Sequence, residues 1–237
     1  MKKITILCFV LACTTMVFGQ EFIPGFDTFS HSKPAYLTLN DGRMLEAEIE
    51  DIDRKKGLIE AITLRSKTNK MTTILPGEIK TMYLPATEMT RLDNQRNTIT
   101  NVRKLQNAGV NMDIIKKGYA YFEKSTVIIK GESLTLLLQL VNPTFSQKIK
   151  VYFDPRASKT LSLSARVMTV AGGIDKSYYV RVGDGNAYRL EKDDYQNEFR
   201  HLFADCPVFV QKYGRSQSPV WRDFAKHVAE YHQLCGN

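Results

Sequence analysis

The chain has 237 residues, of which 43% are hydrophobic and 24% charged, and its formal net charge is +8. This length suits one large domain or two modest ones, and the composition excludes a wholly disordered chain. The positive charge favours weak, salt-sensitive attraction to anionic surfaces such as lipid head groups, and it specifies no partner.

The N-terminus has the pattern of an export signal. Lys2 and Lys3 precede an uncharged apolar run from Ile4 to Phe18, and the small residue Gly19 follows. The run is too short for a spanning helix, so residues 1–19 are predicted to be a signal peptide. The chain is then expected in the periplasm, on the outer surface or outside the cell, without a transmembrane span.

An alternative processing site lies within the same segment. Val10-Leu11-Ala12 before Cys13 resembles a lipoprotein-processing box, and cleavage there would make Cys13 a lipid anchor. The apolar character continues from Thr14 to Phe18, which favours the later cleavage site.

Residues 34–85 have the period of β-strands. Ala35, Leu37 and Leu39 alternate with polar or aromatic residues, and Asp41-Gly42 is a strong hairpin signal. Five short strands with tight turns are expected here, and they predict a small closed β-barrel, which would remove exposed strand edges.

This unit resembles the Sm-like and SH3-like small barrels. The resemblance rests on the turn Asn40-Asp41-Gly42, a bent second strand through Ile49 and Ile52, and the last strand Glu78 to Leu84. Sm-like RNA binders carry an Asp–x–x–Met–Asn signature and a late Arg–Gly pair. This chain has Asp53-Arg54-Lys55-Lys56 and Pro76-Gly77 there, so no RNA-binding residue is carried over and no nucleic-acid partner is expected. The whole chain also resembles exported bacterial proteins of unknown function.

The remaining chain completes an α+β fold. Residues 86–117 are polar with a narrow apolar stripe, which predicts a helical linker. Residues 118–237 are predicted to form an antiparallel β-meander, including a strand over Leu161 to Val170, followed by C-terminal helices. Ser218-Pro219 has the capping pattern expected at the start of the last helix.

Cys206 and Cys235 are the cysteines that remain after removal of the signal. An even pair in an exported chain predicts a disulfide, which would join an earlier helix to the last one.

Aromatic residues on the predicted strands offer a low-specificity binding hypothesis. Tyr121, Tyr152 and Tyr179 could line an exposed sheet face suited to a sugar or a peptide.

No pattern for catalysis, cofactor binding or metal binding is found. His227 and His232 are wrongly spaced for one helix face, and the cysteines lack a Cys-x-x-Cys pair. Ser177 has no nucleophile-elbow sequence, and Gly183-Asp184-Gly185-Asn186 is typical of a hairpin turn. We therefore expect a non-catalytic exported binding module, with an unknown protein, glycan or lipid surface as partner. A hydrolase of envelope or extracellular polymers is the alternative, and the oligomeric state stays open.

Overall fold

The computed structural model describes residues 22–87, 109–157, 175–216 and 218–236. The predicted signal at 1–19 and the alternative lipid anchor at Cys13 lie outside these residues, as does the strand expected over Leu161 to Val170. Most of the predicted helical linker also lies outside them, and the described part of it contains the short helix α2, Met112–Lys116.

The N-terminal strands follow the expected period of two. They are β1 Pro34–Leu39, β2 Met44–Lys55, β3 Leu58–Arg65, β4 Met71–Ile74 and β5 Ile79–Pro85, with the 3-10 turn η1 Pro76–Glu78 before the last. Ala35, Leu37 and Leu39 are all buried, whereas Glu46 and Glu50 on β2 are exposed. One face of this unit therefore lies in a core and the other meets solvent.

Five further strands form the second half of the sheet. They are β6 Tyr119–Ile129, β7 Glu132–Gln139, β8 Ile149–Phe153, β9 Ser177–Val182 and β10 Ala187–Glu191. The β6–β7 hairpin turns at Lys130-Gly131, where φ is +53° and +83°. Positive φ at both positions is typical of the type I′ turn, whose twist matches that of the flanking strands.

Both halves belong to one mostly antiparallel sheet. Its strand order is β4-β3-β2-β1-β5-β6-β10-β9-β8, and β7 also pairs with β6. The sheet is open, with β4 at one end, so this pairing does not show the predicted closed barrel. The long strand β6 explains the continuation, because its first half pairs with β5 and its second half pairs in parallel with β10. That parallel pair is a departure from the expected simple meander.

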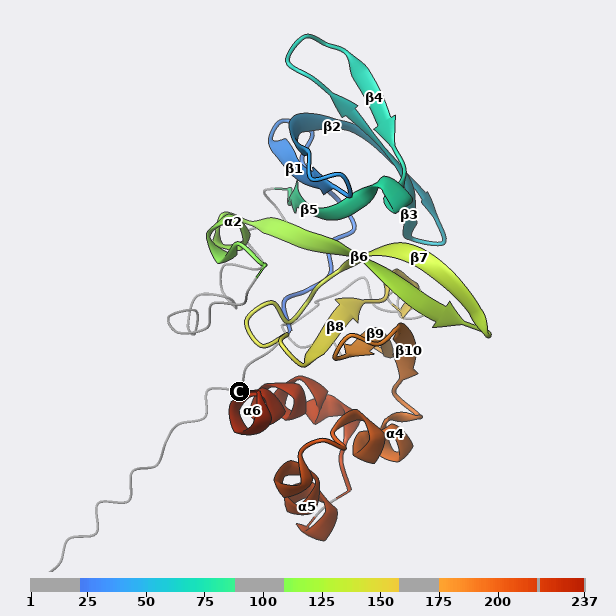
Figure 1. Ribbon diagram of the computed structural model, residues 1–237, viewed down its shortest axis with the longest axis vertical. Coiled ribbons are helices and arrows are strands. Elements are labelled where there is room, and N and C mark those ends of the chain that lie inside the picture. The colour runs from blue at the N-terminus through green and yellow to red at the C-terminus, as the bar shows by residue number, and fades with distance from the viewer. Residues whose placement is uncertain (1–21, 88–108, 158–174, 217, 237) are drawn as a thin grey trace, which may run out of the picture.

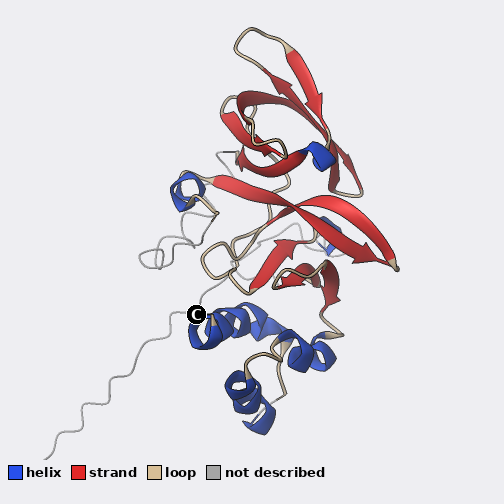
Figure 2. Ribbon diagram, viewed as in Figure 1, coloured by secondary structure: helices blue, strands red, loops and turns tan. Residues whose placement is uncertain are grey.

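Helices cover one face at the far end of the sheet, as Figures 1 and 2 show. They are α4 Tyr195–Leu202, α5 Pro207–Ser216 and α6 Phe224–Cys235, with the 3-10 turn η2 Trp221–Asp223 before the last. Apolar side chains of β8 and β9, including Val151 and Val180, share a core with these helices. The expected cap at Ser218-Pro219 is wrong, since the chain enters η2 first and α6 begins at Phe224.

The structure pairs Cys206 with Cys235, as the sequence predicts. Their Cα atoms are 6.1 Å apart, which is within the range for a disulfide. Cys206 precedes α5 and is buried, and Cys235 ends α6. The bond therefore ties the last helix to the earlier helices across their shared core.

Removing this disulfide should lower the free energy of unfolding by about 3–4 kcal/mol, because it closes a loop with a sequence separation of 29 residues. Urea unfolding with and without reductant measures the loss. The double variant Cys206→Ala/Cys235→Ala is the control, since reductant should not shift its midpoint. A wild-type midpoint that is insensitive to complete reduction would contradict the prediction.

Candidate functional site

Polar side chains collect on one face of β8 and β9, opposite the helix-covered face. Lys150 and Tyr152 alternate with apolar residues along β8, and Tyr179 and Arg181 do so along β9. The register pairs Lys150 with Arg181 and Tyr152 with Tyr179 across the two strands. Since side chains of a strand alternate between faces, these four residues lie together on what we call the inner face.

Glu123 of β6 forms the centre of the first polar cluster on the inner face. Its side chain accepts hydrogen bonds from Lys150 Nζ at 2.7 and 2.8 Å and from the Tyr152 hydroxyl at 2.5 Å. Arg181 Nη2 and the Tyr121 hydroxyl lie further out, each 3.4 Å from a carboxylate oxygen. Glu123 is buried, so two cations and two phenols take the place of water around its charge.

The phenols of this cluster act as hydrogen-bond donors. Burial raises the pKa of Tyr121 and of Tyr152 far above the ordinary value, and the negative charge of Glu123 raises both further. Both hydroxyls therefore keep their protons at neutral pH, which suits donation to a carboxylate.

Asp154, which follows β8, forms the centre of the second cluster. Its carboxylate accepts hydrogen bonds from Arg189 Nε and from the Ser177 hydroxyl, both at 2.7 Å, and from the backbone N–H of Arg156 at 2.9 Å. Arg189 also donates to Ser177 and to the exposed carboxylate of Glu191. The Ser177 hydroxyl thus lies between an acid and a guanidinium, and its proton is already donated to Asp154.

The three tyrosines of the binding hypothesis are brought together but do not form an exposed face. Tyr121, Tyr152 and Tyr179 are 2%, 0% and 0% exposed, and they share a core cluster with Val127 and Leu140. The hypothesis is corrected on this point, because the strand alternation that aligns the rings directs them into the interior.

Sequence reasoning missed the partners of these tyrosines. Glu123 and Lys150 are charged residues within largely apolar strands, and Asp154 directly follows such a strand. A charge at a core-facing position of a strand is costly unless it is paired. A charged residue at a core-facing position was therefore the sequence signal for a buried ion pair. The identity of each partner depends on the register between strands that are distant in sequence.

The other residues considered for chemistry are dispersed. His201 is exposed on α4, and the Nδ1–H of His31 donates to the Ile49 carbonyl at 2.8 Å. His227 and His232 are buried on α6. Among the residues that the structure describes, no three metal-ligating side chains gather into a cation site.

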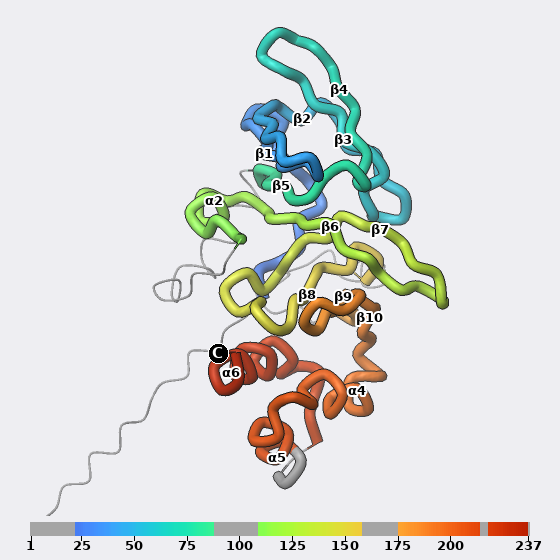
Figure 3. Tube along the Cα trace, in the orientation of Figure 1, coloured from blue at the N-terminus to red at the C-terminus, as the bar shows by residue number. Residues whose placement is uncertain are grey.

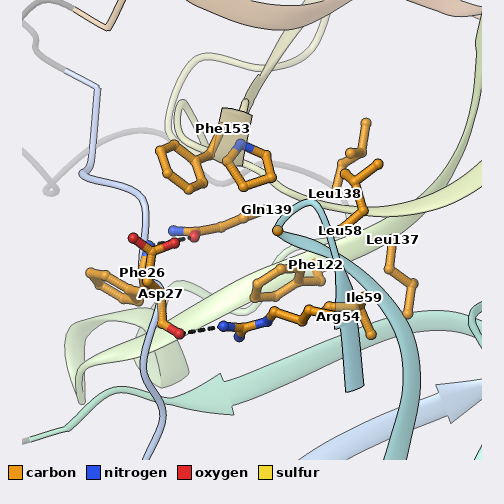
Figure 4. Close-up of a pocket in the computed structure, with 12 residues that line it drawn as sticks. Phe26, Asp27, Arg54, Leu58, Ile59, Phe122, Leu137, Leu138, Gln139 and Phe153 are labelled. Carbon is orange, nitrogen blue, oxygen red and sulfur yellow. Dashed lines mark hydrogen bonds between the residues drawn. The ribbon is translucent and has the colours of Figure 1, made fainter. Parts of the chain in front are cut away.

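A small cavity lies between the β2–β3 hairpin and the end of β8. Figure 4 shows its lining, which includes Phe26, Arg54, Leu58, Gln139 and Phe153. Its volume is about 30 Å³. This is the scale of a water molecule and is far below the roughly 300 Å³ at which ligand pockets begin.

The free edge of β4 is the second candidate site. Among the described strands, β4 pairs with β3 alone, and three of its four residues are exposed. Met71 at its start is 49% exposed, and Leu75 directly after it is 55% exposed. Apolar side chains beside an unpaired strand edge are typical of sites that accept an added strand.

Comparison with protein-family models, curated proteins and solved structures gives no significant match to the chain. No helix in the described ranges is both long enough and apolar enough to cross a bilayer.

His227 should make stability depend on pH. Its Nδ1 lies 2.6 Å from the Tyr195 hydroxyl, and burial lowers the pKa of His227 to about 4 from 6.5. Asp223 and Glu230 oppose the shift, whereas Lys226 and Lys212 add to it. Because the unfolded chain takes up the proton first, stability should fall by about 3 kcal/mol between pH 6.5 and pH 4.

Asp175 should raise the stability as the pH falls from about 6 toward 4. Burial raises its pKa to about 6, so the folded chain takes up this proton before the unfolded chain does. The measurement is therefore the difference in unfolding free energy between the wild type and His227→Gln, in which the contribution of Asp175 cancels. The wild type should lose about 3 kcal/mol relative to the variant as the pH falls to 4. A difference that is constant with pH would disprove the assignment.

Proposed function

We propose that this protein is a non-catalytic binding module that acts outside the cytoplasm and recognises an extended segment of a protein partner at the edge of β4. The observation that carries the proposal is the unpaired edge of β4, flanked by exposed Met71 and Leu75. The inner face supports a structural role for its acids, because Glu123 and Asp154 are each bonded to cations and hydroxyls of the protein itself.

The charge near this edge favours an acidic partner. The turn between β3 and β4 carries Lys67 and Lys70, and both are exposed. Arg65 is already paired with Glu48 at 3.0 Å and lies 3.6 Å from Glu50. An extended peptide with acidic residues would meet these lysines while its main chain pairs with β4.

Export remains part of the proposal. The charged start and apolar run of residues 1–19 support it, and the Cys206–Cys235 pair fits an oxidising compartment. The intact mass of the protein from its native host tests it: a chain beginning at Gln20 supports signal cleavage, and a lipid mass on Cys13 supports the alternative. A mature chain that still begins at Met1 would contradict both signal cleavage and lipidation.

We also infer that residues 34–85 form a small barrel of the Sm-like or SH3-like kind. The order β4-β3-β2-β1-β5 and the shared core of Leu37, Ile62, Ile74 and Met82 support this inference. In this inference the barrel is incompletely closed and the edge of β4 stays unpaired. Fast amide hydrogen exchange at Thr73 would report that open edge, whereas strong protection there would contradict it.

The register of β4 provides a sharp test of the binding edge. The N–H of Ser66 donates to the Lys70 carbonyl at 3.0 Å, so hydrogen-bonded pairs alternate along the hairpin from that point. Thr73 lies opposite Thr63 in a non-hydrogen-bonded pair, and its backbone N–H points to the free edge. Thr73→Pro should thus remove an outward donor while the pairing with β3 remains.

The probe is a phage-displayed library of random peptides, panned on the purified protein. The wild type and Thr73→Ala should enrich acidic extended peptides, and Thr73→Pro should lose them. Equal enrichment by the proline variant, or none by the wild type, would refute binding at the β4 edge. Binding to anionic lipid vesicles that is unchanged in Thr73→Pro, with no peptide enriched, would instead support a lipid surface.

A further inference from the structure

The inner face and its end at Asp154 contain buried polar atoms that have no hydrogen-bond partner. In the part of the chain that the structure describes, they include the Tyr179 hydroxyl and the Nε atoms of Arg156 and Arg181. A buried donor without an acceptor has lost its hydration and gained nothing in return. Such donors, gathered in one place, indicate where the acceptor atoms of a ligand would bind.

The cations of this region differ in their partners. Arg181 pairs with Glu123 at 3.4 Å, and Arg189 pairs with Asp154 at 2.7 Å. Arg156 differs from both, because no carboxylate of the described residues lies within ion-pair distance of its half-buried guanidinium. A partly desolvated cation without an anion is unfavourable, so an anion bound beside Arg156 would be stabilised.

The Tyr179 hydroxyl belongs to the same cluster. The register pairs Tyr179 with Arg189 across β9 and β10, and Asp154 accepts hydrogen bonds from Arg189 Nε and from the Arg156 backbone N–H. Burial raises the pKa of Tyr179, the charge of Asp154 raises it further, and the charges of Arg156 and Arg189 oppose this rise. The hydroxyl therefore keeps its proton at neutral pH and is a donor close to both arginines.

This end of the inner face can be reached from solvent. Figure 3 shows β8, β9 and β10 side by side between β6 and the C-terminal helices. Arg156 lies in the turn after β8 and is half-buried, and the Arg189 side chain is 36% exposed, whereas Tyr179 is fully buried. A small anion would thus pass the arginine side chains and meet the phenol behind them.

We propose that the Arg156 guanidinium and the Tyr179 hydroxyl bind one oxyanion group, the carboxylate or phosphate of a small solute, at the Asp154 end of the inner face. The Nε and a neighbouring Nη of an arginine offer two parallel N–H donors that match two oxygens of such a group, and the phenol adds a third donor. Asp154 does not prevent this, because Arg189 and the Ser177 hydroxyl already compensate its charge. The site is separate from the β4 edge, which lies at the other end of the sheet.

Thermal unfolding in different anions tests the site. The full chain is unfolded at pH 7 in sodium chloride, sodium phosphate and sodium acetate of equal ionic strength. Because a bound anion stabilises the folded chain by mass action, the midpoint should rise by about 3 °C in phosphate, acetate or both relative to chloride. Arg156→Met and Tyr179→Phe should lose most of this rise. In chloride, Arg156→Met should be at least as stable as the wild type, since it removes a cation without a partner.

The matched control is Arg200→Met, because Arg200 is exposed on α4 and should leave the rise intact. A rise in phosphate alone assigns the site to a phosphate group, and a rise in acetate assigns it to a carboxylate. Phosphate also stabilises proteins without binding, because it is excluded from their surface. A rise of equal size in the wild type, Arg156→Met and Arg200→Met would therefore overturn the proposal, as would a wild-type midpoint that is the same in all three salts.

Discussion

Replacement of Glu123 by glutamine should lower the free energy of unfolding by about 3–5 kcal/mol, the largest loss that we expect from a single inner-face variant. The substitution leaves Lys150 and Arg181 close together without their shared anion, and their side chains are only 23% and 21% exposed. Because a buried cation without a partner loses hydration that nothing replaces, the cost exceeds that of one neutral hydrogen bond.

Urea unfolding of Glu123→Gln, of Lys150→Met and of the double variant measures this effect. The double variant should be more stable than the sum of the single losses predicts, since it removes one cation together with the anion. Strictly additive losses would show that Glu123 and Lys150 do not interact in solution.

Asp154→Asn should lower the free energy of unfolding by about 3 kcal/mol, because it leaves the Arg189 guanidinium without its buried anion. Asp154 is fully buried, and its carboxylate binds Arg189 Nε at 2.7 Å and the Ser177 hydroxyl. An amide in its place keeps the shape but removes the charge that faces the guanidinium.

The matched control is Glu191→Gln, because Glu191 binds the same Arg189 from an exposed position. An exposed pair contributes less than about 1 kcal/mol, so this variant should unfold almost as the wild type does. Thermal or urea unfolding compares the two variants, and equal losses would contradict the contrast between buried and exposed pairs.

The inner face has a structural function that follows from these contacts. Two separate acid-centred clusters flank the rings of Tyr152 and Tyr179, and each joins strands that are distant in sequence. The charge pairs of the inner face restrict the register of β6, β8 and β9, since a shift by one residue would place every charge on the wrong face.

The prediction of local structure from sequence was largely sound for the N-terminal strands. Alternating residues such as Ala35, Leu37 and Leu39 indicate their buried face by themselves, because the period of two is a property of the strand. The pairing of Cys206 with Cys235 was equally accessible, since two cysteines have only one intramolecular pairing.

The sequence by itself therefore determined the positions of the N-terminal strands, the helical C-terminus and the disulfide, all of which depend on local periodicity or on simple counting. Only the tertiary structure decided that the sheet continues from β5 to β6 and that the three tyrosines are buried near Glu123 and Asp154. It also decided that the backbone N–H of Phe26 binds the side-chain amide of Gln139. The physical reason is that these features depend on contacts between segments far apart in the chain. The energy of such contacts comes from burial and charge pairing, which no local pattern records.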